Sequence, residues 1–110
     1  MTKVGGIIVL VTCSPVEADK IASTLISEKL AACVNVFPAV ISVYRWKGEV
    51  CKEAECLLLI KSHKAFWERL EQRIKAIHSY EVPEMLCFQI DDGHAPYLDW
   101  LNAQLEGPFH

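Results

Sequence analysis

Three side chains able to ligate transition metals stand at points where the chain is expected to turn. Cys13 follows an apolar stretch, and His78 and Glu84 flank one short loop. A thiol, an imidazole and a carboxylate together suit copper or zinc, and sulfur favours Cu(I). A helix that begins just after Cys13 would favour the thiolate through its backbone N–H dipoles. These residues are the candidate site for copper, as Cu(I) or Cu(II), or for another divalent cation, although they lack the close spacing of a metal motif.

The same residues also have ordinary structural roles, which their types alone favour. Cys13 would then be a small buried hydrophobe, His78 a cation at a helix C-terminus, and Glu84 a carboxylate at the surface or an interface. The chain has five cysteines and no C-x-x-C pair, which suits a reducing compartment and argues against a structural zinc knuckle. Of the other cysteines, those expected to pack as small hydrophobes are Cys33, Cys56 and Cys87, and the one expected to be exposed is Cys51.

A second group combines a lysine, carboxylates and phenols. Glu55 and Lys61 are separated by an even number of residues in one expected strand, so their side chains point to the same face. Tyr80, Glu84 and Tyr97 lie in segments near one end of the expected sheet. If they converge, these groups form a pocket for a small anion or for acid–base chemistry. The alternative is an interface network of salt bridges and stacked rings.

Length and composition limit the class of protein that carries these groups. The 110 residues make one domain, 1–110, and 52% hydrophobic against 23% charged residues excludes a disordered chain. The net charge of −3 supplies no positive field for nucleic acid. The apolar run from Gly5 to Val11 is shorter than the ~20 residues that cross a bilayer, and it does not fit a signal peptide. We expect a cytoplasmic protein with no nucleic-acid or membrane partner.

The elements that must position these side chains begin with a strand and a helix. Residues Gly6–Thr12 form a β-branched run typical of a central strand. A helix is predicted over Pro15–Lys29 because apolar residues recur there at helical spacing. Its start is marked by Ser14 as the N-cap and by Glu17, which completes a capping box.

Two long extended segments, Cys33–Trp46 and Glu49–Lys61, are typical of a β-hairpin with its turn at Lys47-Gly48. Pro38 interrupts the first arm, which implies an edge strand or a bulge. Arms of roughly a dozen residues are about twice the usual strand length. A domain of this size cannot cover them, so we expect the tip with Trp46 to project or to contact another chain.

The second half of the chain repeats the helix-then-strand pattern. Ser62 is the expected N-cap of a helix, which is followed by a loop over His78–Glu84 and a strand over Met85–Ile90. A short third helix is expected from about Pro96. The order β-α-β-β-α-β-α predicts an α+β protein of ferredoxin-like fold, with an antiparallel sheet, a long central hairpin and helices on one face. Exposed hairpin edges favour a homotrimer, because threefold closure uses the same edge repeatedly.

Several stretches of the sequence match a known family. They are Glu28-Lys-Leu-Ala-Ala-Cys33-Val-Asn, Ser42-Val-Tyr44-Arg-Trp46-Lys-Gly48, Glu55 through Ile60-Lys61, His78-Ser-Tyr80-Glu-Val-Pro-Glu84, and Tyr97-Leu-Asp-Trp100-Leu. On these motifs the chain resembles the CutA family of divalent-cation tolerance proteins over nearly its whole length. The resemblance implies a ferredoxin-like subunit in a tight cytoplasmic homotrimer, a role in tolerance to copper and other divalent ions, and metal binding in some members.

The resemblance also implies roles for individual residues. His78 and Glu84 match the family histidine and glutamate around the Tyr-x-x-Pro-Glu run. Cys13 follows Thr12, whereas some members carry a metal-binding cysteine before that threonine. The positions that match residues lining the family's inter-subunit clefts are Glu55, Lys61, Trp46 and Tyr97, to which Tyr80 is added from the loop beside them.

Different functions follow as hypotheses. The leading one is a non-enzymatic, trimeric, metal-responsive protein whose partners are its own copies and a metal ion, with no organic cofactor. The alternative is a small-molecule sensor, since trimeric ferredoxin-like PII signalling proteins hold nucleotides in clefts between subunits. An enzyme using Lys61 and a carboxylate is less favoured, because no nucleophile–base pair is visible in the sequence.

Overall fold

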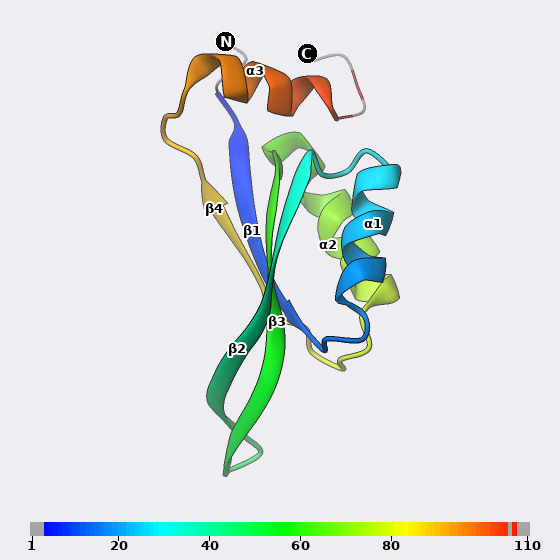
Figure 1. The fold of residues 1–110 in the computed structure, drawn as a ribbon, viewed down its shortest axis with the longest axis vertical. Helices are drawn as coiled ribbons and strands as arrows, with labels where there is room; N and C mark the ends of the chain where they lie inside the picture. Colours follow the sequence, from blue (N-terminus) through cyan, green and yellow to red (C-terminus); the bar gives the residue numbers. More distant parts are fainter. Residues whose placement is uncertain (1–3, 106, 108–110) are drawn as a thin grey trace.

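The strands form one antiparallel sheet in the order β2-β3-β1-β4 (Figure 1). The computed structural model describes residues 4–105 and residue 107. Its strands are β1 (Gly6–Cys13), β2 (Cys33–Trp46), β3 (Glu49–His63) and β4 (Met85–Gln89). Its helices are α1 (Ala18–Ser27), α2 (Trp67–Ile77) and α3 (Ala95–Ala103), with a short 3-10 helix η1 (Lys64–Phe66) before α2. The predicted order β-α-β-β-α-β-α and the ferredoxin-like α+β fold are confirmed.

The core lies between one face of the sheet and the helices α1 and α2, which cover that face (Figure 1). Alternate residues of β1 point into it, since a strand turns successive side chains to opposite faces. The apolar residues of α1 and α2 recur at helical spacing, so they lie on the face of each helix that packs against these strand side chains. The largest fully buried side chains include Ile7, Val9, Val11, Ile21, Leu25, Leu58, Ile60, Leu70 and Ile74.

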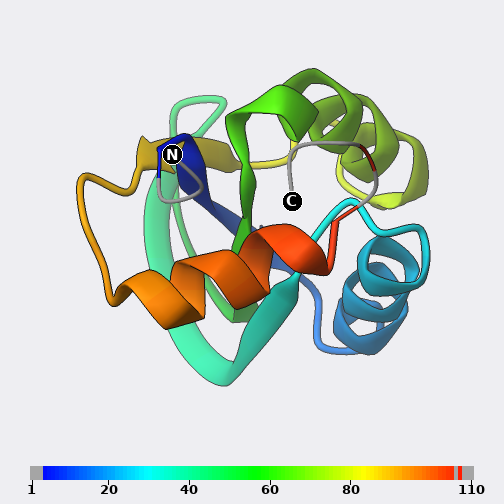
Figure 2. The same ribbon diagram turned by 90° about the horizontal axis from the view of Figure 1, so that it is seen from above.

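Helix α3 lies across the end of the strands opposite the hairpin turn, as the view from above shows (Figure 2). Its leucines are on one side, as the sequence predicts, and Leu98, Leu101 and Leu105 are buried. The face of the sheet away from α1 and α2 is less covered. Leu86 and Phe88 of β4 are each 49% exposed there, so this face presents an apolar surface.

The hairpin of β2 and β3 extends well beyond the helices (Figure 1). Its strands have 14 and 15 residues, and the molecule is accordingly elongated, at 46 × 25 × 22 Å. The turn is Lys47-Gly48, with φ of 51° and 82°. Two positive φ values in a two-residue loop are the signature of a type I′ turn, whose twist matches that of the strands. The predicted hairpin is confirmed.

A β-bulge interrupts the pairing of β2 with β3. Phe37 pairs with Leu57, but the next pair is Val40 with Glu55, so β2 holds one extra residue at this point. The bulge contains Pro38, which has no backbone N–H to donate to the ladder. Pro38 predicted an edge strand or a bulge, and both occur, because β2 is also an edge strand of the sheet.

Two predicted helix starts were wrong. Helix α1 begins at Ala18 instead of Pro15, because residues 15–17 form a turn. Helix α2 is not capped by Ser62, which lies in β3 with its Oγ donating a 2.7 Å hydrogen bond to the carbonyl of Leu30. The N-cap position of α2 is Phe66, while His63 caps the preceding η1, its Nδ1 accepting from the amide of Ala65 at 3.0 Å. Among the described helices, none has the length and apolar character needed to cross a bilayer.

Candidate functional site

His78 ends α2 and is held in place through both of its ring nitrogens. Its Nε2 lies 2.8 Å from the carbonyl oxygen of Thr12 at the end of β1. Its Nδ1 accepts a 3.1 Å hydrogen bond from the amide of Tyr80. The carbonyl can only accept, so Nε2 carries the proton and the ring is the Nε2–H tautomer. Both nitrogens are thus engaged inside the chain, and the side chain is only 8% exposed.

The Tyr80 side chain continues this network to β3. Its hydroxyl donates a 2.5 Å hydrogen bond to Oε2 of Glu55, a carboxylate that is 5% exposed. The Tyr80 ring also contacts the His78 ring, with centroids 4.6 Å apart. Burial and the hydrogen bond to Glu55 raise the pKa of Tyr80 above its usual range, so it stays a neutral donor. We call Thr12, His78, Tyr80 and Glu55 the Tyr80 cluster.

Glu84 lies at the edge of this cluster. Its Oε1 is 3.5 Å from the Oγ1 of Thr12, a long contact that leaves most of the carboxylate free for water. The residue is exposed, in the segment just before β4. The structure therefore brings His78 and Glu84 to the same end of β1 through their contacts with Thr12, and Tyr80 joins them through His78.

Glu17 ties two loops together beside the cluster, and the sequence predicted only one of its two partners. Its carboxylate accepts hydrogen bonds from the amide and hydroxyl of Ser14, at 3.3 and 2.7 Å. It accepts two more from the amide and hydroxyl of Ser79, at 3.0 and 2.7 Å. Burial works against ionisation, but these four donors lower the pKa of Glu17 to about 2. The Ser14-x-x-Glu17 pattern indicated the first pair of contacts, while nothing in the sequence indicated Ser79.

Lys61 belongs to a second, separate group near α3. Its Nζ donates a 3.3 Å hydrogen bond to the Tyr97 hydroxyl and lies 5.5 Å from the centre of the Tyr97 ring. Tyr97 in turn stacks on Trp100, with ring centroids 5.5 Å apart. Lys61 is six residues from Glu55 along β3, a span of roughly 20 Å. Within one chain, the two groups do not form the single pocket that the sequence allowed.

Trp46 lies apart from both groups, at the tip of the hairpin. It is 43% exposed, and the Nζ of Lys47 lies 5.9 Å from the centre of its ring. The residue is exposed despite its large apolar ring, as expected for a side chain that projects from the domain.

Cys13 does not have the thiolate character expected of it. The residue is fully buried, and α1 begins five residues later, too far for its amide dipoles to act on the sulfur. Burial first, and then the nearby Cys56, Glu17 and Glu55, raise the pKa of the Cys13 thiol to about 12. Within residues 4–105 and 107, no three His, Cys, Asp or Glu side chains are grouped so as to hold a metal ion.

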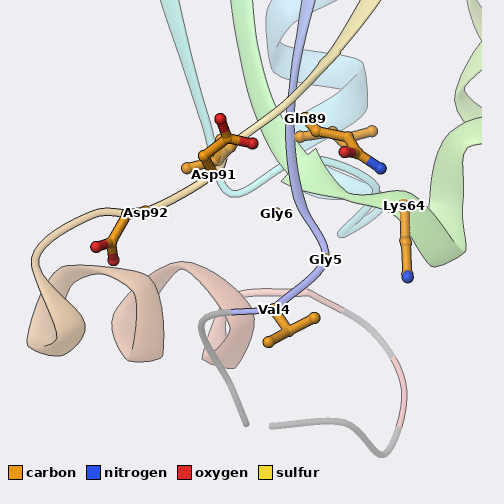
Figure 3. A pocket seen from close by; sticks show the side chains of 9 residues that line it. Val4, Gly5, Gly6, Lys64, Gln89, Asp91 and Asp92 are labelled. Atoms are coloured by element: carbon orange, nitrogen blue, oxygen red, sulfur yellow. The ribbon is translucent and has the colours of Figure 1, made fainter.

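A cavity of about 400 Å³ lies beside α3, at the other end of β1 from the Tyr80 cluster (Figure 3). Glycines 5 and 6, Gln89 and residues of the β4–α3 connection line it. Its charged side chains are those of Lys64, Asp91 and Asp92, and Figure 3 shows them pointing in different directions instead of toward one centre. The cavity therefore lacks convergent polar groups of the kind that define a ligand site.

The sheet order, the helices on one face and the long hairpin define an α+β protein of ferredoxin-like fold. A family model described as "CutA1 divalent ion tolerance protein" matches residues 7–104. The chain belongs to the CutA1 divalent ion tolerance protein family, which confirms the resemblance seen in the sequence motifs.

Relatives and solved structures agree with this assignment. A "Divalent-cation tolerance protein CutA" of Thermus thermophilus is 46% identical over 96 residues, covering 86% of this chain and 93% of the relative. A chloroplastic CutA 1 of Oryza sativa is 46% identical over 102 residues, which is 92% of this chain but 58% of the relative. The chain thus spans little more than half of that plant protein.

Among solved structures, CutA1 from Oryza sativa superposes with a TM-score of 0.93 at 40% identity, covering 98% of this chain and all of that one. A structure described as "PII-like protein CutA" from Nostoc sp. PCC 7120 has a TM-score of 0.86 at 38% identity, covering 91% of this chain and 97% of that one.

Proposed function

We propose that the protein acts in tolerance to divalent cations, copper among them, as a cytoplasmic homotrimer without catalytic turnover. The observation that carries this proposal is the family match over residues 7–104. It is supported by a relative that is 46% identical along 93% of its own length and is named for divalent-cation tolerance. Two plant relatives are named as chloroplastic, so the compartment is part of the proposal.

The trimer is supported by what a single chain leaves uncovered. Strands β2 and β4 are the edges of the sheet, and an unpaired edge is a template for further strands. The apolar residues exposed on the sheet and hairpin include Phe37, Ile41, Val43, Trp46, Leu86 and Phe88. A closed threefold arrangement would cover both the edges and these side chains with copies of the same surface. It would also allow the Tyr80 cluster of one chain to approach Lys61 and Trp46 of others.

The residues proposed as metal ligands do not form a ready copper site in one chain. Cys13 holds a protonated, buried thiol, and both nitrogens of His78 have hydrogen-bond partners. Glu84 alone is exposed with most of its carboxylate free. We therefore propose that copper or another divalent ion binds weakly near Glu84, with His78 as a ligand only after its ring leaves the Tyr80 amide. Cys13 would join them only if its thiol lost its proton.

Copper titration tests this site. Isothermal titration of Cu(II), and of Cu(I) without oxygen, into the assembled protein should show weaker binding for His78→Ala and Glu84→Gln than for the native chain. His94→Ala is the matched control, because His94 is an exposed histidine at the start of α3. Equal affinity in the native chain and both site variants would remove the proposed site.

A growth assay tests the function itself. The chain, expressed in a bacterial strain that lacks its own family member, should restore growth at inhibitory copper concentrations. A Glu84→Gln chain at equal abundance should restore it less. Growth that the native chain does not improve would overturn the role in tolerance, whatever the titration shows.

A small-molecule sensor is the second candidate function, supported by one side-chain contact and by the description of one similar structure. Lys61 has an ammonium group seated on the Tyr97 ring beside the stacked Trp100, an arrangement suited to an organic anion with a ring. One similar structure is described as PII-like. A thermal-shift screen with nucleotides and organic anions should then raise the Tm of the native protein and not of Lys61→Met, with the exposed Lys20→Met as control. A panel without any shift would reject this function.

A further inference from the structure

Two cysteines, Cys13 and Cys56, lie directly opposite each other on neighbouring strands. Cys13 is the last residue of β1 and is the register partner of Cys56 in β3. Partners in an antiparallel pair point to the same face, and both belong to the core beneath α1 and α2. The thiols of Cys13 and Cys56 are both free.

The backbone separation of such a pair fits a disulfide. Directly opposed residues of antiparallel strands have Cα atoms about 4.5–5.5 Å apart. Disulfides join residues whose Cα atoms are about 4.4–6.8 Å apart. The Cα separation expected of the Cys13–Cys56 pair therefore lies within the range found for disulfides.

The surroundings favour an uncharged product over a metal thiolate. Cys13 and Cys56 are 0% and 3% exposed, and the Glu17 and Glu55 carboxylates act on Cys13 through space. A soft metal ion held by two thiolates would bring net negative charge into this buried, acid-flanked position. A disulfide is neutral and adds no charge. Charge therefore disfavours a metal held by two thiolates at this position, while it places no such penalty on the disulfide product.

The bulge in β2 lies beside Cys56, which is 3% exposed. Cys56 has no ladder partner in β2, because it lies opposite the bulge between Phe37 and Val40. Its Sγ is 3.5 Å from the carbonyl oxygen of Pro38. A strand whose ladder is interrupted opens locally at lower free energy than a continuous one. Cys13 is the last residue of β1 and is 0% exposed, so Cys56 is the thiol that an oxidant meets first when the strand opens.

We propose that Cys13 and Cys56 form a reversible disulfide when the protein meets a hydroperoxide. Cys56 attacks the peroxide oxygen, the O–O bond breaks, and a sulfenic acid and water form. The Cys13 sulfur then attacks the sulfenic sulfur of Cys56. The sulfenic hydroxyl leaves with the proton of the Cys13 thiol as a second water. In sum, two thiols and H₂O₂ give one disulfide and two waters. The bond would tie the end of β1 to β3 beside Glu55, and it would remove Cys13 as a metal ligand.

The test is peptide mapping after oxidation of the native assembly. A chain with Cys33→Ser, Cys51→Ser and Cys87→Ser keeps only the two buried thiols. After hydrogen peroxide treatment, denaturation and alkylation, it should yield one peptide pair joined through Cys13 and Cys56 and a mass loss of about 2 Da. A reductant should reverse both. The full native chain is treated in parallel, where oxidation of the exposed Cys87 shows that the oxidant is active.

Several results would overturn the proposal. One is the recovery of Cys13 and Cys56 as alkylated thiols in the variant, under conditions that oxidise Cys87 in the native chain. Another is oxygen addition to either sulfur in place of the disulfide. The last is a disulfide that forms only when peroxide is added to the unfolded chain. The bond should also raise Tm by ~5 °C or more, because it closes a long loop in the unfolded state. Cys56→Ala in the same background should show no such rise.

Discussion

The hydroxyl of Tyr80 donates a 2.5 Å hydrogen bond to Oε2 of Glu55, joining the loop after α2 to β3, the strand that returns from the hairpin turn. The two residues are 25 positions apart in the chain and come from different layers. Since Glu55 is 5% exposed, its carboxylate depends on this donor for much of the hydrogen bonding that water would otherwise supply. The contact thus couples the base of the hairpin to His78 and the end of β1.

Removing the Tyr80 hydroxyl should destabilise the protein. Tyr80→Phe leaves a buried carboxylate without its partner, and we expect a loss of about 1–3 kcal/mol in the free energy of unfolding. Guanidinium denaturation at fixed chain concentration measures it. Tyr44→Phe is the matched control, because Tyr44 donates the same kind of hydrogen bond to Glu53 on the exposed hairpin. Equal losses in the two variants would show that burial of Glu55 is not the cause.

Glu17 should make stability depend on acid pH. Four hydrogen bonds hold its pKa at about 2, below the ordinary 4.5, so folding favours the ionised form. Its contribution is fully present above pH 4.5 and is lost as pH falls toward 2. Glu17→Gln should cost about 1–3 kcal/mol at pH 7 and flatten the acid limb of a stability–pH curve.

Asp19→Asn is the control for that experiment. Asp19 is an exposed carboxylate in the first turn of the same helix, α1. Its replacement should leave the acid limb in place. An unchanged limb in Glu17→Gln would show that the ties to Ser14 and Ser79 do not stabilise the folded protein in solution.

Ser62 should matter as a buried strand residue. Ser62→Ala removes the 2.7 Å hydrogen bond to the Leu30 carbonyl in a fully buried position, which should cost about 1–3 kcal/mol. Ser27→Ala removes a 3.3 Å hydrogen bond to the carbonyl of Thr24 at the exposed end of α1 and should change stability by less than about 0.5 kcal/mol. Thermal and chemical unfolding of both variants decide the point, and a neutral Ser62→Ala would refute it.

A charge on the open face of the sheet should break the proposed trimer. Phe88 is 49% exposed on edge strand β4, where a neighbouring copy would cover it. Phe88→Glu buries an unpaired carboxylate in that contact, so sedimentation equilibrium should show smaller species or aggregates. Gln72→Glu, on the exposed side of α2, adds the same charge elsewhere and should leave the assembly intact. A trimer that survives Phe88→Glu would mean that this face is not the interface.

Local patterns in the sequence were sufficient for most of the fold. The β-branched run of β1 and the apolar spacing of α2 each depend on neighbours within one element. The hairpin turn at Lys47-Gly48 is equally local, because glycine is favoured at positive φ. Element order then follows from the chain itself, and few topologies satisfy it.

The errors arose where a distant residue decides the local structure. Glu17 reaches back to Ser14 as predicted, but it also binds Ser79, which is 62 positions away, and the helix starts only after this tie. Ser62 looks like a helix cap, yet Leu30 recruits its hydroxyl into the core.

The surroundings of the proposed metal ligands are set by distant residues in the same way. The expected ligand His78 is engaged by the Thr12 carbonyl, 66 positions earlier in the chain, and by the neighbouring Tyr80 amide. The pKa of Cys13 likewise depends on the burial that the fold creates and on carboxylates from other elements. No spacing rule in one sequence contains these distances.

The single extra residue between Phe37 and Val40 marks the point where the hairpin leaves the packed part of the domain. On its domain side the sheet carries the helices, and on its far side the two strands run on as a bare arm. A deletion or insertion at this joint would redirect the arm while leaving the packed layers as they are. The way copies of the chain meet can therefore be altered separately from the way each one folds.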